Sequence, residues 1–88
     1  MLEKKEYVRR LAKFLVENQT TMTGRNLADH LNWNEFKTSY DTEYAGGRGT
    51  YKLINATYDW LVSIEFQNDA DCVALAFKKP DGTFAYEK

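Results

Sequence analysis

The chain has 88 residues, of which 43% are hydrophobic and 15% aromatic, and its formal net charge is -1. This length and composition predict one folded domain, 1–88, and exclude a disordered segment. No apolar run approaches the roughly 20 residues that a membrane-spanning helix needs, and the first ten residues lack the apolar core of a signal peptide. We therefore expect no membrane partner and a cytoplasmic location, which the single cysteine, Cys72, also favours because it cannot form an internal disulfide.

Charge is distributed unevenly along the chain. The net charge is +2 over residues 1–22, 0 over 23–55 and -3 over 56–88. This balance argues against a strongly basic nucleic-acid binder but does not exclude a small one. Any basic surface that contacts a nucleic acid must therefore be local.

Helical periodicity predicts two helices in the first third of the chain. In the segment "LEKKEYVRRLAKFLVEN", one apolar stripe consists of Tyr7, Val8, Leu11, Phe14 and Leu15. In "TGRNLADHLNW", Thr23 is the expected N-cap because its hydroxyl can accept a hydrogen bond from a free backbone N–H. The apolar face of this second helix is Leu27, Ala28 and Leu31, and Asn32 or Asn34 is expected to end it.

The middle of the chain predicts an extended excursion followed by a third helix. Polar and apolar residues alternate over 36–44, which predicts a short extended segment or small hairpin with its turn near Asp41. The third helix is expected from about Gly49 to Phe66. Its apolar stripe is Tyr51, Ile54, Tyr58 and Leu61, and its polar face is Lys52, Asn55, Asp59 and Ser63.

The tail "CVALAFKKPDGTFAYEK" predicts a β-hairpin. Val73, Leu75 and Phe77 alternate with alanines, and the "KPDG" between the two arms has turn chemistry, with Gly82 suited to a positive φ. The alternative is that "DADCVALAF" begins a fourth helix, capped by Asp69 or Asp71.

The expected order of helix, helix, extended excursion, helix and hairpin resembles a winged helix-turn-helix, an α+β fold of three helices and a C-terminal β-hairpin wing. The resemblance implies DNA binding, with the third helix in the major groove and the second helix crossing behind it.

The segment "LADHLNWNEFKTSYDTEYAGGRGTYKLI" is in addition similar to a stretch in the DNA-binding part of large serine recombinases. Leu31-Asn32, Thr38, Tyr44 and a helix from Thr50 match that pattern, whereas Glu35 and Asp41 stand where it usually has glycine. No recombinase catalytic domain accompanies the segment, so recombinase activity is not implied. The resemblance implies only a helical unit that contacts DNA.

The junction "GGRG" before the third helix suggests a phosphate contact. A helix N-terminus presents unpaired N–H groups, Gly47 and Gly49 allow a close backbone approach, and Arg48 adds a charge-assisted contact. The spacing of nucleotide P-loops and of dinucleotide sites is missing. A DNA phosphate and a plain flexible turn both remain open.

The expected DNA contacts come from four segments. Asn55 can pair with adenine and Lys52 can reach guanine or phosphate, although a solvated helix face gives the same pattern. Arg25 and Lys37 are expected to position the domain on phosphates, and two lysines lie at the tip of the expected wing. The full set is Arg25, Lys37, Arg48, Thr50, Lys52, Asn55, Lys78 and Lys79.

No enzymatic or metal chemistry is expected from these residues. His30 has no companion at metal-ligand spacing, Cys72 has no activating partner, and no catalytic pair or cofactor motif is present. The leading hypothesis is a non-enzymatic DNA-binding protein, a transcriptional or mobile-element regulator. The alternative is a protein–protein interaction module on the same scaffold, favoured if aromatic residues prove exposed. A linked hypothesis is a homodimer formed through Tyr7 and Phe14 of the first helix.

Overall fold

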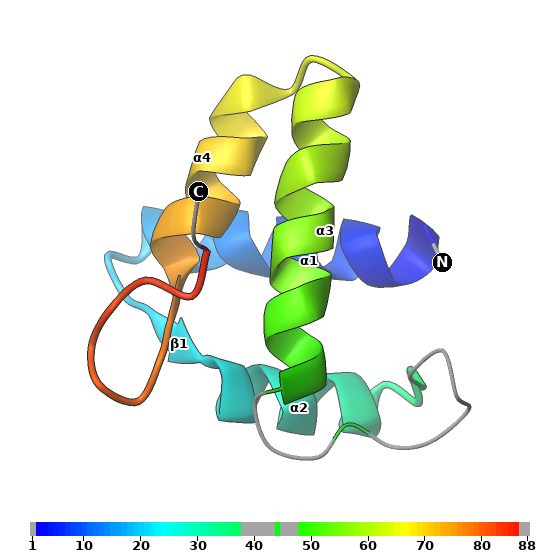
Figure 1. The fold of residues 1–88 in the computed structure, drawn as a ribbon, viewed down its shortest axis with the longest axis vertical. Coiled ribbons are helices and arrows are strands. Elements are labelled where there is room, and N and C mark those ends of the chain that lie inside the picture. Colours follow the sequence, from blue (N-terminus) through cyan, green and yellow to red (C-terminus); the bar gives the residue numbers. More distant parts are fainter. Residues whose placement is uncertain (1, 38–43, 45–47, 87–88) are drawn as a thin grey trace.

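The computed structural model describes residues 2–37, 44 and 48–86 (Figure 1). Its elements in chain order are α1 (Leu2–Glu17), β1 (Met22–Thr23), α2 (Gly24–Trp33), α3 (Arg48–Ser63), α4 (Gln67–Ala76) and β2 (Phe77–Lys78). The described part of the chain is thus mostly helical, with four helices and one small parallel sheet. α3 crosses in front of α1, and α2 runs beneath both (Figure 1).

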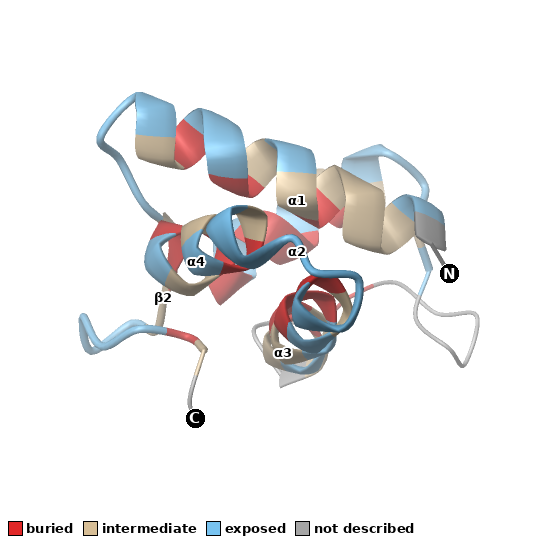
Figure 2. Ribbon diagram, turned by 90° about the horizontal axis from the view of Figure 1, so that it is seen from above, coloured by how far each residue is buried: buried red, intermediate tan, exposed pale blue. Residues whose placement is uncertain are grey.

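The core lies where the inner faces of the four helices meet. Figure 2 shows the buried positions on the sides of the helices that face one another. Fully buried side chains come from every helix and from β2: Val8, Leu27, Leu31, Ile54, Leu61, Val73 and Phe77. One residue of the expected α1 stripe is different, because Phe14 is 60% exposed and Ala12 is buried instead.

The predicted ends of α2 are confirmed. The hydroxyl of Thr23 accepts a hydrogen bond from the backbone N–H of Asn26 at 3.2 Å, which makes Thr23 the N-cap. Asn34 is the C-cap. α3 is also present, but it begins at Arg48 and ends at Ser63, slightly earlier at each end than the periodicity predicted.

The C-terminal third differs from the predicted hairpin. Gln67–Ala76 is a helix, so the predicted strand is wrong from Val73 to Ala76, and the alternative of a fourth helix in this segment is correct. Its N-cap is Phe66, with no side-chain cap, and not an aspartate. The physical reason is an alanine-rich sequence that buries Ala70, Val73 and Ala76 at helical spacing against the core.

After α4, the described chain has one short strand, Phe77–Lys78, which pairs in parallel with β1, Met22 with Phe77 and Thr23 with Lys78. The expected turn follows: Gly82 has φ 90° and its N–H donates to the carbonyl of Lys79 at 2.9 Å. An antiparallel bridge joins Lys78 to Phe84. The last described residue, Tyr86, stacks on Tyr58 of α3 with ring centroids 3.8 Å apart.

The expected excursion over 36–44 falls largely outside the described residues, as do Gly46 and Gly47. Of this segment, the structure describes Phe36, Lys37 and Tyr44. Tyr44 is 8% exposed, its N–H donates to Asn32 Oδ1 at 2.8 Å, and its carbonyl accepts from Asn32 Nδ2 at 2.9 Å. Asn32, near the end of α2, therefore fixes the position of the Tyr44 backbone, which precedes α3.

Candidate nucleic-acid interface

Three segments that are distant in the sequence meet at one end of the molecule. The pairing of Thr23 with Lys78 places β2 beside the start of α2. A Cβ on Gly24 would lie 2.7 Å from Cε1 of Tyr51 and 2.9 Å from Oγ1 of Thr50, so the first turns of α2 and α3 are in close contact. We call this region the basic end; its cations are Arg25, Lys52, Lys78 and Lys79.

The cations of the basic end differ in how far they are engaged by the protein itself. Arg25 and Lys52 are exposed, and neither makes an ion pair with another described residue. Lys78 is half-buried and its Nζ lies 5.2 Å from the ring centroid of Phe84. Lys79 is also half-buried. Two helix N-termini beside these cations form a surface suited to phosphate groups.

Two of the expected contact residues point into the protein. Thr50 is fully buried beside Gly24, so its hydroxyl is not available at the surface. The side-chain N–H of Asn55 donates to the carbonyl of Tyr51 at 2.9 Å, and its Oδ1 is buried without a partner among the residues described. The amide of Asn55 therefore does not present the donor and acceptor pair that reading adenine requires.

Lys37 and Arg48 are the remaining expected contacts. Lys37 is exposed but follows the C-terminal end of α2, whereas Arg25 is at its beginning. Arg48 is the first residue of α3, and its side chain lies outside the described structure. The exposed residues of α3 between Lys52 and Ser63 include Asp59 and Val62. Among the described side chains, Lys52 is the cation that α3 contributes to the surface, in its second turn.

The charges at the opposite contact, between α1 and α4, are paired within the fold. Arg9 Nε lies 2.6 Å from Asp69 Oδ2, and Lys13 Nζ lies 3.5 Å from Asp69 Oδ1. Arg9 Nη1 also lies 3.1 Å from Glu6 Oε1. The hydrogen bond to Asp69 raises the pKa of Arg9. Burial, with the Asp69 charge second, raises the pKa of the neighbouring Cys72 thiol.

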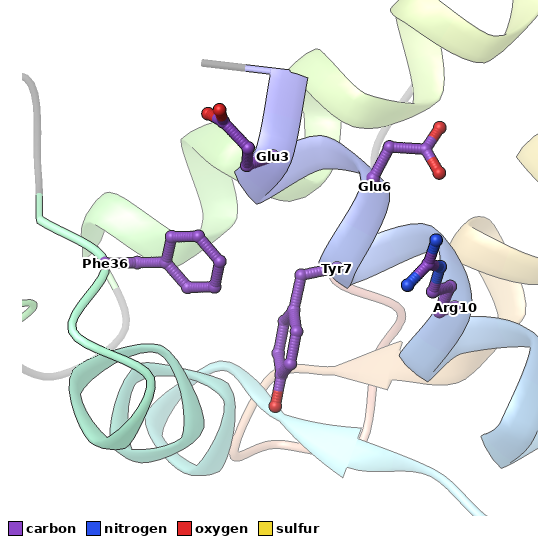
Figure 3. Close-up of a pocket in the computed structure, with 5 residues that line it drawn as sticks. All are labelled: Glu3, Glu6, Tyr7, Arg10 and Phe36. Atoms are coloured by element: carbon purple, nitrogen blue, oxygen red, sulfur yellow. The ribbon is translucent and has the colours of Figure 1, made fainter.

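α1 carries a pocket that the helical periodicity of the sequence did not reveal. The pocket has a volume of about 400 Å³ and is lined by Glu3, Glu6, Tyr7, Arg10 and Phe36 (Figure 3). The Phe36 ring points toward Tyr7, and their ring centroids are 5.5 Å apart. Phe36 arrives from the segment after α2, and Tyr7 was expected on the apolar stripe of α1, so the local pattern of the helix could not indicate a hollow between these two rings.

Among the described residues, no group of three or more His, Cys, Asp or Glu side chains is arranged to hold a metal ion. In the same part of the chain, no helix combines the length and apolar character needed to cross a bilayer. Comparisons with protein-family models, curated proteins and solved structures found no match to this chain.

Proposed function

We propose that the protein is a small, non-enzymatic binder of duplex DNA, acting as a transcriptional or mobile-element regulator, and that the basic end is its contact surface. The observation that carries the proposal is that the β1–β2 pairing and the Gly24–Tyr51 contact bring together the backbone segments that bear Arg25, Lys52 and Lys78. Because the whole chain carries a net charge of -1, a surface that gathers cations beside two helix N-termini is where a polyanion would dock.

The engaged amide of Asn55 and the burial of Thr50 favour backbone contacts over base reading at this end. The proposed mode is therefore phosphate binding that positions the domain, with little direct sequence readout from α3. The order α1, α2, α3 agrees with the resemblance to a winged helix-turn-helix, but α4 stands where the resemblance places the first wing strand.

The test is fluorescence anisotropy with a labelled mixed-sequence duplex of about 20 base pairs, repeated across a salt series. Arg25→Ala combined with Lys52→Ala should weaken binding and reduce the slope of log K against log salt by about 0.9 for each phosphate that the variant no longer neutralises. The matched control is Lys5→Ala combined with Lys37→Ala, which removes the same charge elsewhere and should have a much smaller effect. Absence of wild-type binding at low salt, or equal weakening in the two double variants, would sink the proposal.

A second candidate is the protein–protein interaction module, because aromatic side chains are exposed. Trp33 is 80% exposed, Phe14 60%, Phe66 46% and Phe84 45%. Exposed aromatic side chains are the residue type that protein–protein interfaces favour. A partner that copurifies with the wild type and is absent with Trp33→Ser, in a protein that fails the duplex assay, would favour this function over DNA binding.

A further inference from the structure

The outward side of α1 carries charges of opposite sign in its two halves. Glu3 and Glu6 lie in the first half, and Arg10 and Lys13 in the second. Glu3, Arg10 and Lys13 are exposed and Glu6 is half-buried. Glu3 is also engaged, Glu6 pairs with Arg9, and Lys13 pairs with Asp69, whereas Arg10 has no ion-pair partner in the described part of the chain.

The same side of α1 carries a protruding ring and a pocket. Phe14 is 60% exposed, and it lies seven residues, about two turns, after Tyr7 on the same side of the helix. Tyr7 lines the pocket of about 400 Å³ together with Phe36, Arg10 and the two glutamates (Figure 3). An exposed aromatic and a partly aromatic hollow thus lie along one helix face, about 10 Å apart along its axis.

These features complement each other when the helix meets a second copy of itself in the antiparallel direction. If the two helices cross at the level of residue 8, Glu6 faces Arg10 of the other copy, and Glu3 faces Lys13. The two-fold axis repeats both pairings on the other side of the crossing. In this arrangement Phe14 lies next to the other copy's Glu3, at the edge of the pocket that Tyr7 and Phe36 line.

We propose that the outward face of α1 is a two-fold interface between two copies of this chain, with Phe14 of each copy in the α1 pocket of the other. The partner of this face is α1 of a second copy, because an identical helix that runs in the antiparallel direction presents the same charges in the reverse order. The proposal is independent of DNA binding, since the basic end lies on α2, α3 and β2 and not on this face.

Sedimentation velocity and light scattering over a concentration series test the interface. The wild type should shift from 10.3 kDa toward twice that mass as concentration rises. Phe14→Ala should raise the dissociation constant about tenfold or more, as expected for an aromatic anchor in a pocket. The matched control is Leu75→Ala on α4, a side chain that is 51% exposed and lies outside the proposed face, and it should leave the mass distribution unchanged.

A charge exchange makes the test specific for the antiparallel register. Glu6→Arg places a second arginine against Arg10 of the other copy, and Arg10→Glu places two glutamates together, so each variant alone should be monomeric. An equimolar mixture of the two variants should form heterodimers, because one copy then carries two cations and the other two anions. Glu6→Arg also removes the Glu6–Arg9 ion pair, which destabilises that variant. Recovery of a dimer on mixing would still report the interface, because mixing does not repair a folding defect.

Three outcomes would overturn the proposal. A wild type that remains at 10.3 kDa up to about 1 mM has no such interface. A dimer that survives Phe14→Ala, or variants that stay monomeric when mixed although circular dichroism shows both folded, would place the interface elsewhere.

Discussion

The two helix contacts at opposite ends of the core use their charges differently. Between α1 and α4, the side chains of Arg9 and Asp69 are only 24% and 14% exposed and lie 2.6 Å apart. Between α2 and α3, the close approach is made by Gly24 against Tyr51, and the nearby Arg25 and Lys52 remain exposed. At the α1–α4 contact the cations form ion pairs that stabilise the fold. The α2–α3 contact is instead stabilised by the close packing of the two helices.

This difference indicates where a ligand can gain binding energy. Arg9 already has two carboxylates and its side chain is only 24% exposed, so a phosphate would have to displace Asp69 before it could bind this guanidinium. Arg25 and Lys52 give up no ion pair within the described structure when a phosphate arrives. The basic residues at the two contacts would therefore differ in value for the proposed nucleic-acid binding, a difference that the sequence alone does not reveal.

The largest effect is expected at the α1–α4 contact. Asp69→Ala removes two ion pairs and leaves Arg9 partly buried with Glu6 as its remaining ion-pair partner, so the free energy of unfolding should fall by about 2–3 kcal/mol. Urea denaturation monitored by circular dichroism measures the change. Asp59→Ala is the matched control, because Asp59 is exposed on α3 without an ion pair to any described residue, and it should change stability by less than about 0.5 kcal/mol. Equal destabilisation in the two variants would show that the Asp69 pairs contribute nothing specific.

A somewhat smaller effect is expected at the α2–α3 contact. Gly24→Ala puts a methyl group 2.7 Å from Cε1 of Tyr51, and the forced separation should lower the free energy of unfolding by about 1–3 kcal/mol. The same variant should weaken duplex binding, because α2 and α3 no longer hold the cations of the basic end together.

Gly49→Ala is the control for that prediction. The added Cβ meets the ring of Tyr44 at 3.3 Å, a much milder contact. The gain of about 1 kcal/mol in helix propensity offsets it, so the net change should be near zero. If Gly49→Ala destabilises as much as Gly24→Ala, the close approach at Gly24 is not what holds the two helices together.

Local patterns were sufficient for the helices that have strong periodicity and caps. The cap chemistry of Thr23 and the apolar stripe of α3 both predicted what the structure contains. α4 was ambiguous because Val73, Leu75 and Phe77 alternate as a strand would. The structure instead leaves Leu75 51% exposed and buries Ala70 and Ala76, and the small side chains that fit against α1 carry little weight in a hydrophobic pattern.

The candidate site was less predictable because it depends on contacts between distant segments. Lys78 lies beside the start of α2 only through the parallel pairing with Thr23, which no local pattern contains. Thr50 was expected at the surface but is buried, because Gly24 of another helix packs against it. Asn55 lies on the polar face of α3 as expected, but its amide is engaged by the carbonyl of Tyr51.

The smallest expected effect is a pH dependence at the α1–α4 contact. Burial raises the pKa of the Cys72 thiol above its value in the unfolded chain, and the charge of Asp69 raises it further. The folded state therefore favours the neutral thiol, so this contribution to stability is present below the unfolded pKa and is lost as pH rises through the folded pKa. The stability difference between the wild type and Cys72→Ala should shrink from about pH 8 to about pH 10, by less than about 1 kcal/mol.

The rate of alkylation by iodoacetamide against pH gives the thiol pKa directly, since the thiolate is the reactive form. Its midpoint should lie above the value of about 8.5 for a free thiol, and Asp69→Ala should bring it down because the carboxylate is then absent. A midpoint that Asp69→Ala leaves unchanged would mean that the Asp69 charge does not contribute to the raised pKa. The influence of Asp69 would then be confined to Arg9 and Lys13, and the charges at this contact would act only as ion pairs between the two helices.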